Sequence, residues 1–285
     1  MYKLTLQNEA GNTLEFNQLG GAYTITDIEG LNPPDATINT SQIAMLDGEK
    51  FNSAKVNMRT LNIAFAIETD AERNRIEVYR VLKPKRPVTV YYQSDLRDVY
   101  IIGYIKALDI GYFDQKQVCT VSILCPSPFW RSAQEFVNEL SRIIGMFHFP
   151  FSSTAIPQIV FGYEDATASV TVDNAGDLET GLIIQIYARA QVANPKIFDY
   201  ETQEFIGVNY TLLPADLVTI DTNPGRKTVK LLREGVTYNI FNALMKDSAW
   251  LQLPANGGVY TYMVGSGMAT DLNITILHNT LFEGV

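Results

Sequence analysis

Few side chains in this sequence are suited to catalysis or to metal binding. The 285 residues include two histidines, His148 and His278, and neither has a cysteine or a second histidine at the spacing of a zinc site. Cys125 and His148 could form a nucleophile–base pair, but nothing around them marks an activated thiol. A G-x-S-x-G nucleophile motif and a P-loop are both absent from the sequence. We therefore expect no metal ion, no cofactor and no catalytic residue.

Other short motifs favour turns and packing over ligand binding. Residues 265–270, GSGMAT, contain only two of the three glycines of a dinucleotide fingerprint. Residues 173–177, DNAGD, lack most ligands of an EF-hand calcium loop. Trp130 and Trp250 could stack on a sugar ring, but their neighbours favour anchors in a core or an interface. The carboxylate pair of a glycosidase is a spatial arrangement, which sequence spacing does not identify.

The two cysteines belong to one predicted strand and are too far apart to bridge each other. Cys119 and Cys125 are six residues apart, which corresponds to about 20 Å in an extended chain. We expect two buried thiols in a reducing compartment, with an intermolecular disulfide as the alternative.

Composition excludes several classes of protein. Hydrophobic residues make up 46% of the chain and charged residues 19%, which excludes global disorder and a coiled coil. The net charge of −9 argues against a protein that binds duplex nucleic acid, because such a protein needs a basic surface. The first twenty residues do not resemble a secretory signal, and no apolar run is long enough for a membrane span.

Alternating hydrophobicity predicts strands in the first half of the chain. We expect strands at 61–67, 88–92, 99–105 and 119–125, with the second and third forming a hairpin. Asp47-Gly48 is typical of a turn with positive φ.

One helix is predicted between Thr69 and Lys83. Thr69 and Glu72 have the spacing of a capping box, and Pro84 ends the helix. The expected apolar stripe comprises Ile76, Val78, Tyr79 and Leu82.

Three arginines of this helix are candidate contact residues. The helix should expose Arg73, Arg75 and Arg80 either to solvent or to a neighbouring subunit or partner.

The second half of the chain is predicted to be almost entirely β. A short helix is expected within residues 132–142, before an aromatic stretch at 147–151. Short strands with turn signals between them then predict a sandwich of two antiparallel sheets. The expected strands are 159–161, 169–172, 182–188, 196–199, 205–210, 217–221, 228–232 and 272–277.

These elements define the expected fold class and domains. The fold is mainly β with one helix, divided into an N-terminal domain at 1–130, a linker at 131–156 and a C-terminal β-sandwich at 157–285. Residues 1–130 contain 13 basic and 15 acidic side chains, whereas residues 131–285 contain 9 and 16. The acidic excess therefore lies mostly in the second half.

The order of these features resembles the distal tail proteins of phages with long, non-contractile tails. The most specific segment is Cys125-Pro126-Ser-Pro128-Phe129-Trp, which is similar to the family's Cys-Pro-(Asp)-Pro-(aromatic) signature, with serine replacing the usual acidic residue. Residues 147–153 resemble the family's linker, and residues 174–180 its turn that opens the C-terminal sandwich. Residues 248–254 and 282–284 resemble two late segments, so the resemblance covers nearly the whole chain.

This resemblance implies a structural role. It implies a homo-hexameric ring at the tip of the virion tail, with an N-terminal belt and a C-terminal galectin-like sandwich. Its partners would be the tail-tube protein, a tail-associated hub or lysin protein, and receptor-binding or baseplate proteins. DNA would only pass through the channel, and the protein would be made in the cytoplasm of the bacterial host. The resemblance implies no enzymatic activity.

A carbohydrate-binding β-sandwich module for cell-wall glycans is the alternative function. It is motivated by the predicted sandwich and by Trp250. Residues 278–281, HNTL, nevertheless lack the His-x-Asn-x-Arg pattern of sugar-binding galectins.

Overall fold

The computed structural model describes residues 2–17, 21–45, 47–112, 117–140, 142–145, 162–165 and 169–285. The chain forms two compact units, Met1–Gln134 with Leu281–Val285, and Glu135–Thr280. Strands dominate both units, and the described residues contain one α-helix, α1 (Ala71–Val81). The predicted fold class, mainly β with one helix, is confirmed. No helix among the described residues is long and apolar enough to cross a membrane.

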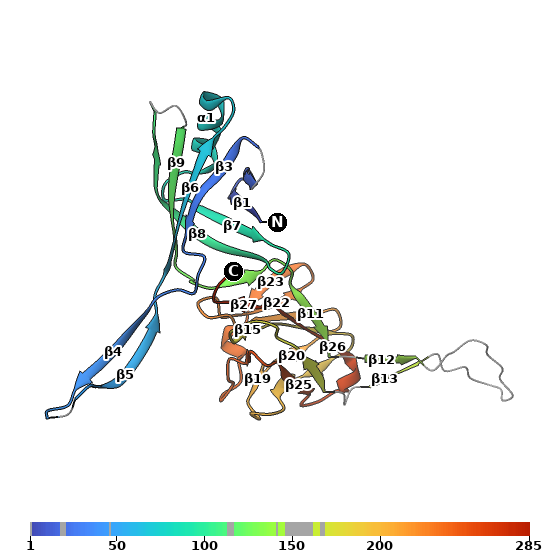
Figure 1. Cartoon of the computed structure of the whole chain (residues 1–285). Helices are drawn as coiled ribbons and strands as arrows, with labels where there is room; N and C mark the ends of the chain where they lie inside the picture. Colours follow the sequence, from blue (N-terminus) through green and yellow to red (C-terminus); the bar gives the residue numbers. More distant parts are fainter. Residues whose placement is uncertain are drawn as a thin grey trace, which may run out of the picture. The chain divides into compact units, whose positions relative to one another are not determined.

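The first unit is built on a nine-stranded antiparallel sheet (Figure 1). Its strands follow the order β2-β1-β7-β8-β9-β6-β3; β10 pairs with β8, and β27 pairs with β10. Helix α1 packs against β1, β2 and β6. The strands are β1 (Lys3–Asn8), β2 (Thr13–Asn17), β3 (Tyr23–Glu29), β6 (Arg59–Ile67), β7 (Pro87–Gln93), β8 (Asp98–Ile110), β9 (Gln117–Cys125), β10 (Trp130–Ser132) and β27 (Leu281–Phe282).

Alternation of apolar and polar residues explains the centre of this sheet. Leu61, Ile63 and Phe65 on β6 are at most 1% exposed, and β7 and β8 form the predicted hairpin. Cys119 and Cys125 are buried free thiols on one face of β9, as predicted. Because successive side chains of a strand point to opposite faces, this pattern places one face of each strand in the core.

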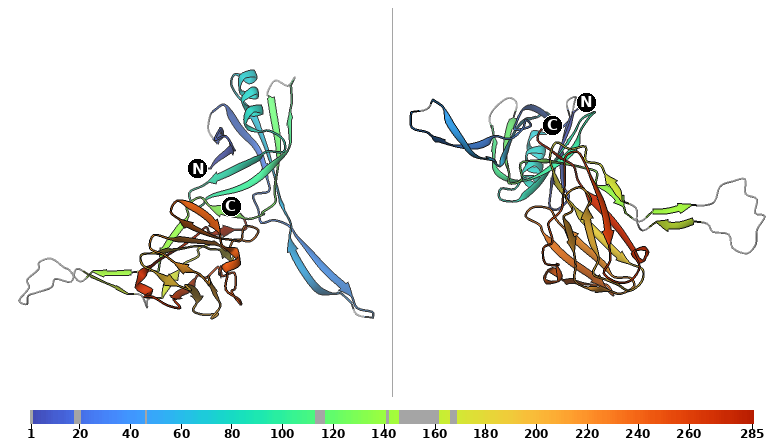
Figure 2. Two further views of the ribbon diagram at one scale, coloured as in Figure 1. Left: turned by 180° about the vertical axis from the view of Figure 1, so that it is seen from behind. Right: turned by 90° about the horizontal axis from the view of Figure 1, so that it is seen from below.

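A long hairpin, which we call the arm, extends from the first unit (Figures 1 and 2). It consists of β4 (Ala36–Gln42) and β5 (Glu49–Val56), and every residue of both strands is exposed. Gly48 has a φ of +90° between the two strands, which confirms the turn predicted at Asp47-Gly48. The sequence did not predict the arm, because its strands have no buried face to create an apolar alternation.

Helix α1 differs from its prediction in both its start and its buried face. The residue before the helix is Asp70, with a left-handed φ of +40°, and no side chain caps the helix, so the capping box predicted at Thr69 is wrong. The buried face contains Asn74, Val78 and Val81, whereas Ile76 and Tyr79 are 43% and 38% exposed. The predicted apolar stripe is therefore confirmed for Val78 and Leu82, which are at most 1% exposed, and wrong for Ile76 and Tyr79.

Hydrogen bonds explain why Asn74, a polar residue, lies on the buried face of α1. The Asn74 amide donates to the Thr69 main-chain oxygen, and the Tyr23 hydroxyl donates to the Asn74 main-chain oxygen. A buried polar side chain is stable when its hydrogen bonds are made. A prediction from hydrophobicity alone does not include this compensation.

The second unit is a sandwich of two antiparallel sheets around one core. The six-stranded sheet has the order β11-β26-β16-β21-β22-β23, with strands β11 (Phe136–Glu139), β16 (Ile183–Ala188), β21 (Leu217–Asp221), β22 (Thr228–Arg233), β23 (Val236–Asn239) and β26 (Leu272–His278). The four-stranded sheet has the order β14-β25-β18-β19, with strands β14 (Val170–Val172), β18 (Lys196–Asp199), β19 (Phe205–Gly207) and β25 (Gly258–Met263).

Short elements complete the second unit. The 3-10 helices are η1 (Phe241–Ala243) and η2 (Ala269–Asp271). Three two-stranded pairs are β12 (Arg142–Gly145) with β13 (Gly162–Asp165), β15 (Thr180–Gly181) with β24 (Gln252–Leu253), and β17 (Val192–Ala193) with β20 (Thr211–Leu212).

The connection between the units differs from the sequence prediction. The helix expected within 132–142 is wrong, because this region contains β10, β11 and the start of β12. The second unit begins at Glu135, since β11 pairs with β26, whereas the prediction placed the linker at 131–156. The strand expected at 159–161, the aromatic stretch at 147–151 and His148 lie outside the described residues.

Candidate functional site

A buried arginine organises the region of the family signature in the first unit. Arg59 begins β6 and is 3% exposed. Its Nε donates to the main-chain oxygen of Pro128 at 2.7 Å, and its Nη1 donates to that of Asn32 at 2.6 Å. Nη1 also donates to Gly30, and Nη2 donates to Glu283, in each case to the main-chain oxygen. Burial lowers the pKa of Arg59, and four carbonyl acceptors compensate the buried cation.

The signature itself forms the corner between β9 and β10. Cys125 ends β9 with a fully buried thiol, and residues 126–129 turn the chain into β10, where Trp130 is also fully buried. The Arg59 guanidinium lies 5.7 Å from the Trp130 ring centroid. Of the predicted signature residues, Cys125 is buried, Pro128 and Phe129 are half-buried, and Pro126 is exposed. The structural role of the signature stays a prediction.

Close packing leaves no reactive thiol at this corner. A β-carbon at Gly103 would lie 2.7 Å from the Cys125 sulfur. Burial raises the pKa of Cys125 to about 12 and that of Cys119 to about 11, so both remain protonated at neutral pH. A nucleophilic Cys125 is therefore not supported, and its suggested partner His148 lies outside the described residues.

The last strand of the chain completes the same corner. Strand β27 pairs with β10, with Trp130 opposite Phe282 and Arg131 opposite Leu281. The Arg97 guanidinium lies 3.9 Å from the Phe282 ring centroid. Residues 281–285, which the sequence analysis assigned to the C-terminal domain, therefore belong to the first unit.

Arg59 was not among the residues predicted from the sequence to be structurally important. It lies beside Asn57 and Met58, with no local motif, and its acceptors are distant in the sequence. An arginine directly before an apolar strand was the only local signal.

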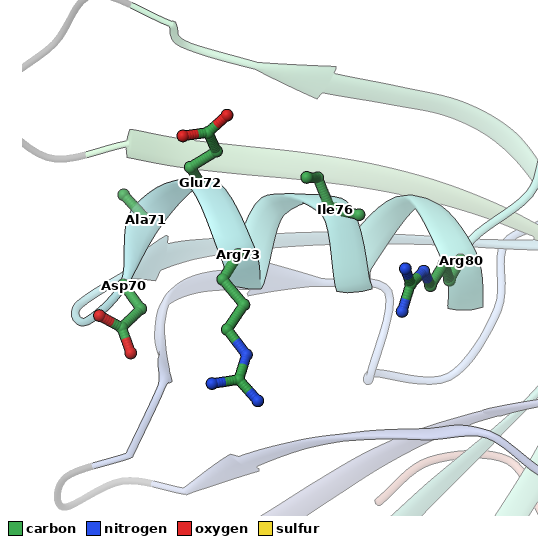
Figure 3. Close-up of a pocket in the computed structure, with 6 residues that line it drawn as sticks. All are labelled: Asp70, Ala71, Glu72, Arg73, Ile76 and Arg80. Atoms are coloured by element: carbon green, nitrogen blue, oxygen red, sulfur yellow. The ribbon is translucent and has the colours of Figure 1, made fainter.

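The outer surface of α1 contains two of the three candidate contact arginines. Arg73 and Arg80 are exposed and, with Asp70, Glu72 and Ile76, line an open hollow along the helix (Figure 3). Arg73 extends to one side of the helix, and Glu72 and Ile76 extend to the other.

Arg75 is placed differently from Arg73 and Arg80. Its side chain is half-buried, and the guanidinium lies 5.1 Å from the ring centroid of Tyr112, whose hydroxyl is 2.6 Å from that of Tyr79. The structure therefore separates the three predicted contact residues into an exposed pair, Arg73 and Arg80, and Arg75, which packs against Tyr112.

The DNAGD loop of the second unit is a structural turn. The Asn174 amide donates to the main-chain oxygens of Leu178 and Pro254, both at 3.0 Å, and its Oδ1 accepts from the Gly176 N–H. These bonds join two segments that carry the family resemblance. Within the part of the chain that the structure describes, no group of three or more His, Cys, Asp or Glu residues is placed to hold a metal ion.

Both tryptophans are engaged in packing. Trp130 is in the core of the first unit. Trp250 stacks against Phe241, with 5.7 Å between ring centroids, and the Lys227 ammonium lies 5.1 Å from the Trp250 ring centroid. A sugar stacking on Trp250 would compete with these contacts, which weakens the main residue-level argument for glycan binding.

The fold and the packing of these residues define a class of protein. The first unit combines an antiparallel sheet with one helix, and the second is a β-sandwich. Residues 175–276 match the family model of the siphovirus-type tail component, C-terminal domain. No curated protein sequence matches the chain.

Solved phage structures share the fold along the whole chain. The Dit protein of phage SPP1, described as a hub of the adsorption apparatus of phages that infect Gram-positive bacteria, has a TM-score of 0.69 at 16% identity over 98% of this chain and 99% of that chain. Chains from the activated phage P2 baseplate with calcium and with strontium have TM-scores of 0.53 and 0.55 at 10% identity, each over 97% of this chain and 97% and 98% of those chains. The family match of residues 175–276 and the fold shared along the chain confirm the resemblance to siphophage distal tail proteins.

Proposed function

We propose that this protein is a non-enzymatic structural hub at the virion tail tip of a phage or prophage with a long, non-contractile tail. It assembles as a hexameric ring that joins the tail tube to a tail-associated hub protein and to receptor-binding or baseplate proteins. The observation that carries this proposal is the family match of residues 175–276 within a chain whose whole fold is similar to the SPP1 hub protein.

The arm supports assembly into a ring. A two-stranded hairpin alone is marginally stable in water, yet the arm exposes Ile38 and Phe51 at 62% each, and Met45 fully. A neighbouring subunit that covers these side chains would stabilise the hairpin. A closed ring needs two different complementary surfaces on each subunit, and the arm supplies one of them.

The outer surface of α1 is the candidate for a further contact. Arg73 and Arg80 are exposed there beside the apolar side chain of Ile76, which is 43% exposed. This combination of cations around an apolar centre is common in protein interfaces.

The net charge of −9 also suits a ring around a DNA channel, because an acidic protein repels the phosphates of DNA and does not retain them.

Light scattering after size-exclusion chromatography, over a concentration series, tests the ring. We expect a particle of about six times the chain mass of 31.8 kDa. The double variant Ile38→Ser with Phe51→Ser should remain monomeric with an unchanged circular dichroism spectrum. Tyr200→Ser, at a 61% exposed residue of the second unit, is the matched control and should form the ring. A wild-type chain that stays monomeric at every concentration, even when mixed with its tail-tube protein, contradicts the proposal.

A further inference from the structure

Strand β23 is one of the two edge strands of the six-stranded sheet in the second unit (Figure 1). It forms a hairpin with β22, and among the described strands it pairs with no other. Glu234 and Gly235 connect the two strands with φ values of +50° and +77°, as a two-residue type I′ turn requires. All four residues of β23 are exposed.

The register shows which main-chain groups face outward. The Ile240 N–H donates to the Val229 oxygen at 3.0 Å, directly beyond the end of β23. In an antiparallel pair, bonded and non-bonded residues alternate, so Tyr238 and Val236 also bond to β22. Thr237 and Asn239 therefore direct their N–H and C=O groups away from the sheet. These unpaired main-chain groups can form hydrogen bonds with another strand.

Two apolar side chains of β23, Val236 and Tyr238, are exposed to solvent although they lie on the core side of the sheet. Tyr238 lies opposite Leu231, which is 1% exposed, so Tyr238 and Val236 lie on the core side of the sheet. They are nevertheless 48% and 51% exposed. The opposing sheet has four strands against six, and it does not cover these two residues. An added strand would place its own alternate side chains against them.

The stretch of chain that contains β23 is basic, whereas the rest of the second unit is acidic. Residues 226–246 contain five basic side chains and one acidic side chain, and the remainder of residues 135–280 contains three basic and fourteen acidic ones. Arg226 and Arg233 are engaged by Asp221 and Asp216. Among the described residues, no carboxylate forms an ion pair with the three lysines of this stretch, Lys227, Lys230 and Lys246.

We propose that the β23 edge is a docking site for an extended, acidic segment of a partner protein, which adds to the sheet as a seventh strand. Main-chain bonds at Thr237 and Asn239 would hold the segment, and its apolar side chains would cover Val236 and Tyr238. Its carboxylates would pair with Lys230, which is exposed and lies opposite Asn239, since complementary charge favours the correct partner. The inference rests on the proposed function, which supplies proteins that attach to the hub.

A short fluorescent peptide of alternating glutamate and valine, titrated against the full-length chain by fluorescence anisotropy, is the probe. We expect Thr237→Pro to weaken its binding about five- to tenfold, because the proline removes one outward N–H. Thr237→Val keeps the N–H and is the matched control, which should bind as the wild type does. Circular dichroism confirms that both variants fold.

Charge is tested separately. Lys230→Glu should weaken binding at least as much as Thr237→Pro, whereas Lys55→Glu, the same change on the arm, should have no effect. A matching lysine–valine peptide should not bind.

Three results would overturn the inference. One is the absence of binding to the glutamate–valine peptide, and another is equal binding by Thr237→Pro and Thr237→Val. The third is preferential, lysine-dependent binding of poly(glycerol phosphate), which would assign the surface to an anionic polymer. A chain that binds the peptide but forms no ring contradicts the proposed function alone, and a ring that does not bind the peptide contradicts this inference alone.

Discussion

The Nε of Arg59 donates to the main-chain oxygen of Pro128 at 2.7 Å, across 69 residues of sequence. The bond joins the start of a central strand to the proline-rich corner that carries the family signature. The same guanidinium reaches Glu283, 224 residues away, through its Nη2. One buried side chain thus connects three distant parts of the chain.

Removing this guanidinium should destabilise the first unit. We expect Arg59→Met to lower its free energy of unfolding by about 3 kcal/mol, because buried carbonyls lose a charged donor. Urea denaturation followed by circular dichroism measures the change. Arg73→Met, at an exposed arginine of the same unit, should change stability by less than about 0.5 kcal/mol. Equal effects of the two substitutions would contradict the role assigned to Arg59.

Deleting residues 281–285 should affect the first unit rather than the second. The deletion removes β27, including Phe282, which is 8% exposed, and the carbonyl of Glu283 that Arg59 binds. Hydrogen exchange followed by mass spectrometry should show faster exchange in β8, β9 and β10 and unchanged protection in β16 and β21. Loss of protection confined to the sandwich would show that the strand belongs there.

Two residues that the sequence placed in the same apolar stripe of α1 have opposite predictions, because only one of them is buried. Val78 is fully buried, so Val78→Ala should cost about 2 kcal/mol of stability. Ile76 is 43% exposed, and Ile76→Ala should change the stability by less than about 0.5 kcal/mol. Thermal denaturation of the two variants distinguishes the observed buried face from the one that the sequence predicted.

Reversing the outward charges of α1 should impair assembly without unfolding the chain. Arg73→Glu with Arg80→Glu places two carboxylates on the proposed contact surface. Light scattering should show a higher concentration threshold for ring formation, with an unchanged melting temperature. Arg189→Glu with Lys196→Glu makes the same change in charge on the second unit and is the control. Unimpaired assembly of the α1 variant would show that this surface faces solvent in the ring.

Acidification should destabilise the second unit through His278. This residue is 2% exposed and stacks on Phe136, with 5.3 Å between ring centroids. Burial lowers the pKa of His278 below its ordinary value of 6.5, an effect that the main chain of Asp173 partly offsets. The native state therefore binds fewer protons than the unfolded state, so stability falls as pH decreases below about 6.5. Urea denaturation at pH 7.5 and pH 5.5 should show a smaller difference for His278→Phe than for the wild type. An equal pH dependence of the two proteins would contradict this assignment.

Hydrophobic periodicity predicted the parts of the fold that have one buried face. The strands around Ile63 and Val121 were identified because each alternates between core and exterior. The arm was missed because both of its faces are exposed. Ile76 and Tyr79 were wrongly assigned to the buried face of α1, where Asn74 is buried instead because its hydrogen bonds are made. The contribution of Arg59 depends on contacts between distant residues, which no local pattern encodes.

The position of β27 beside β10 has a mechanical consequence. The chain leaves the first unit after β10 and returns to it through β27, so two adjacent antiparallel strands connect the units. Tension applied to the second unit therefore reaches the first unit at two points of the chain, after Gln134 and before Leu281. The resistance then comes from the hydrogen bonds of β10 to β8 and from the donors of Arg59. In the proposed hub, a pull on the second unit would reach the first unit through two segments of the chain rather than one.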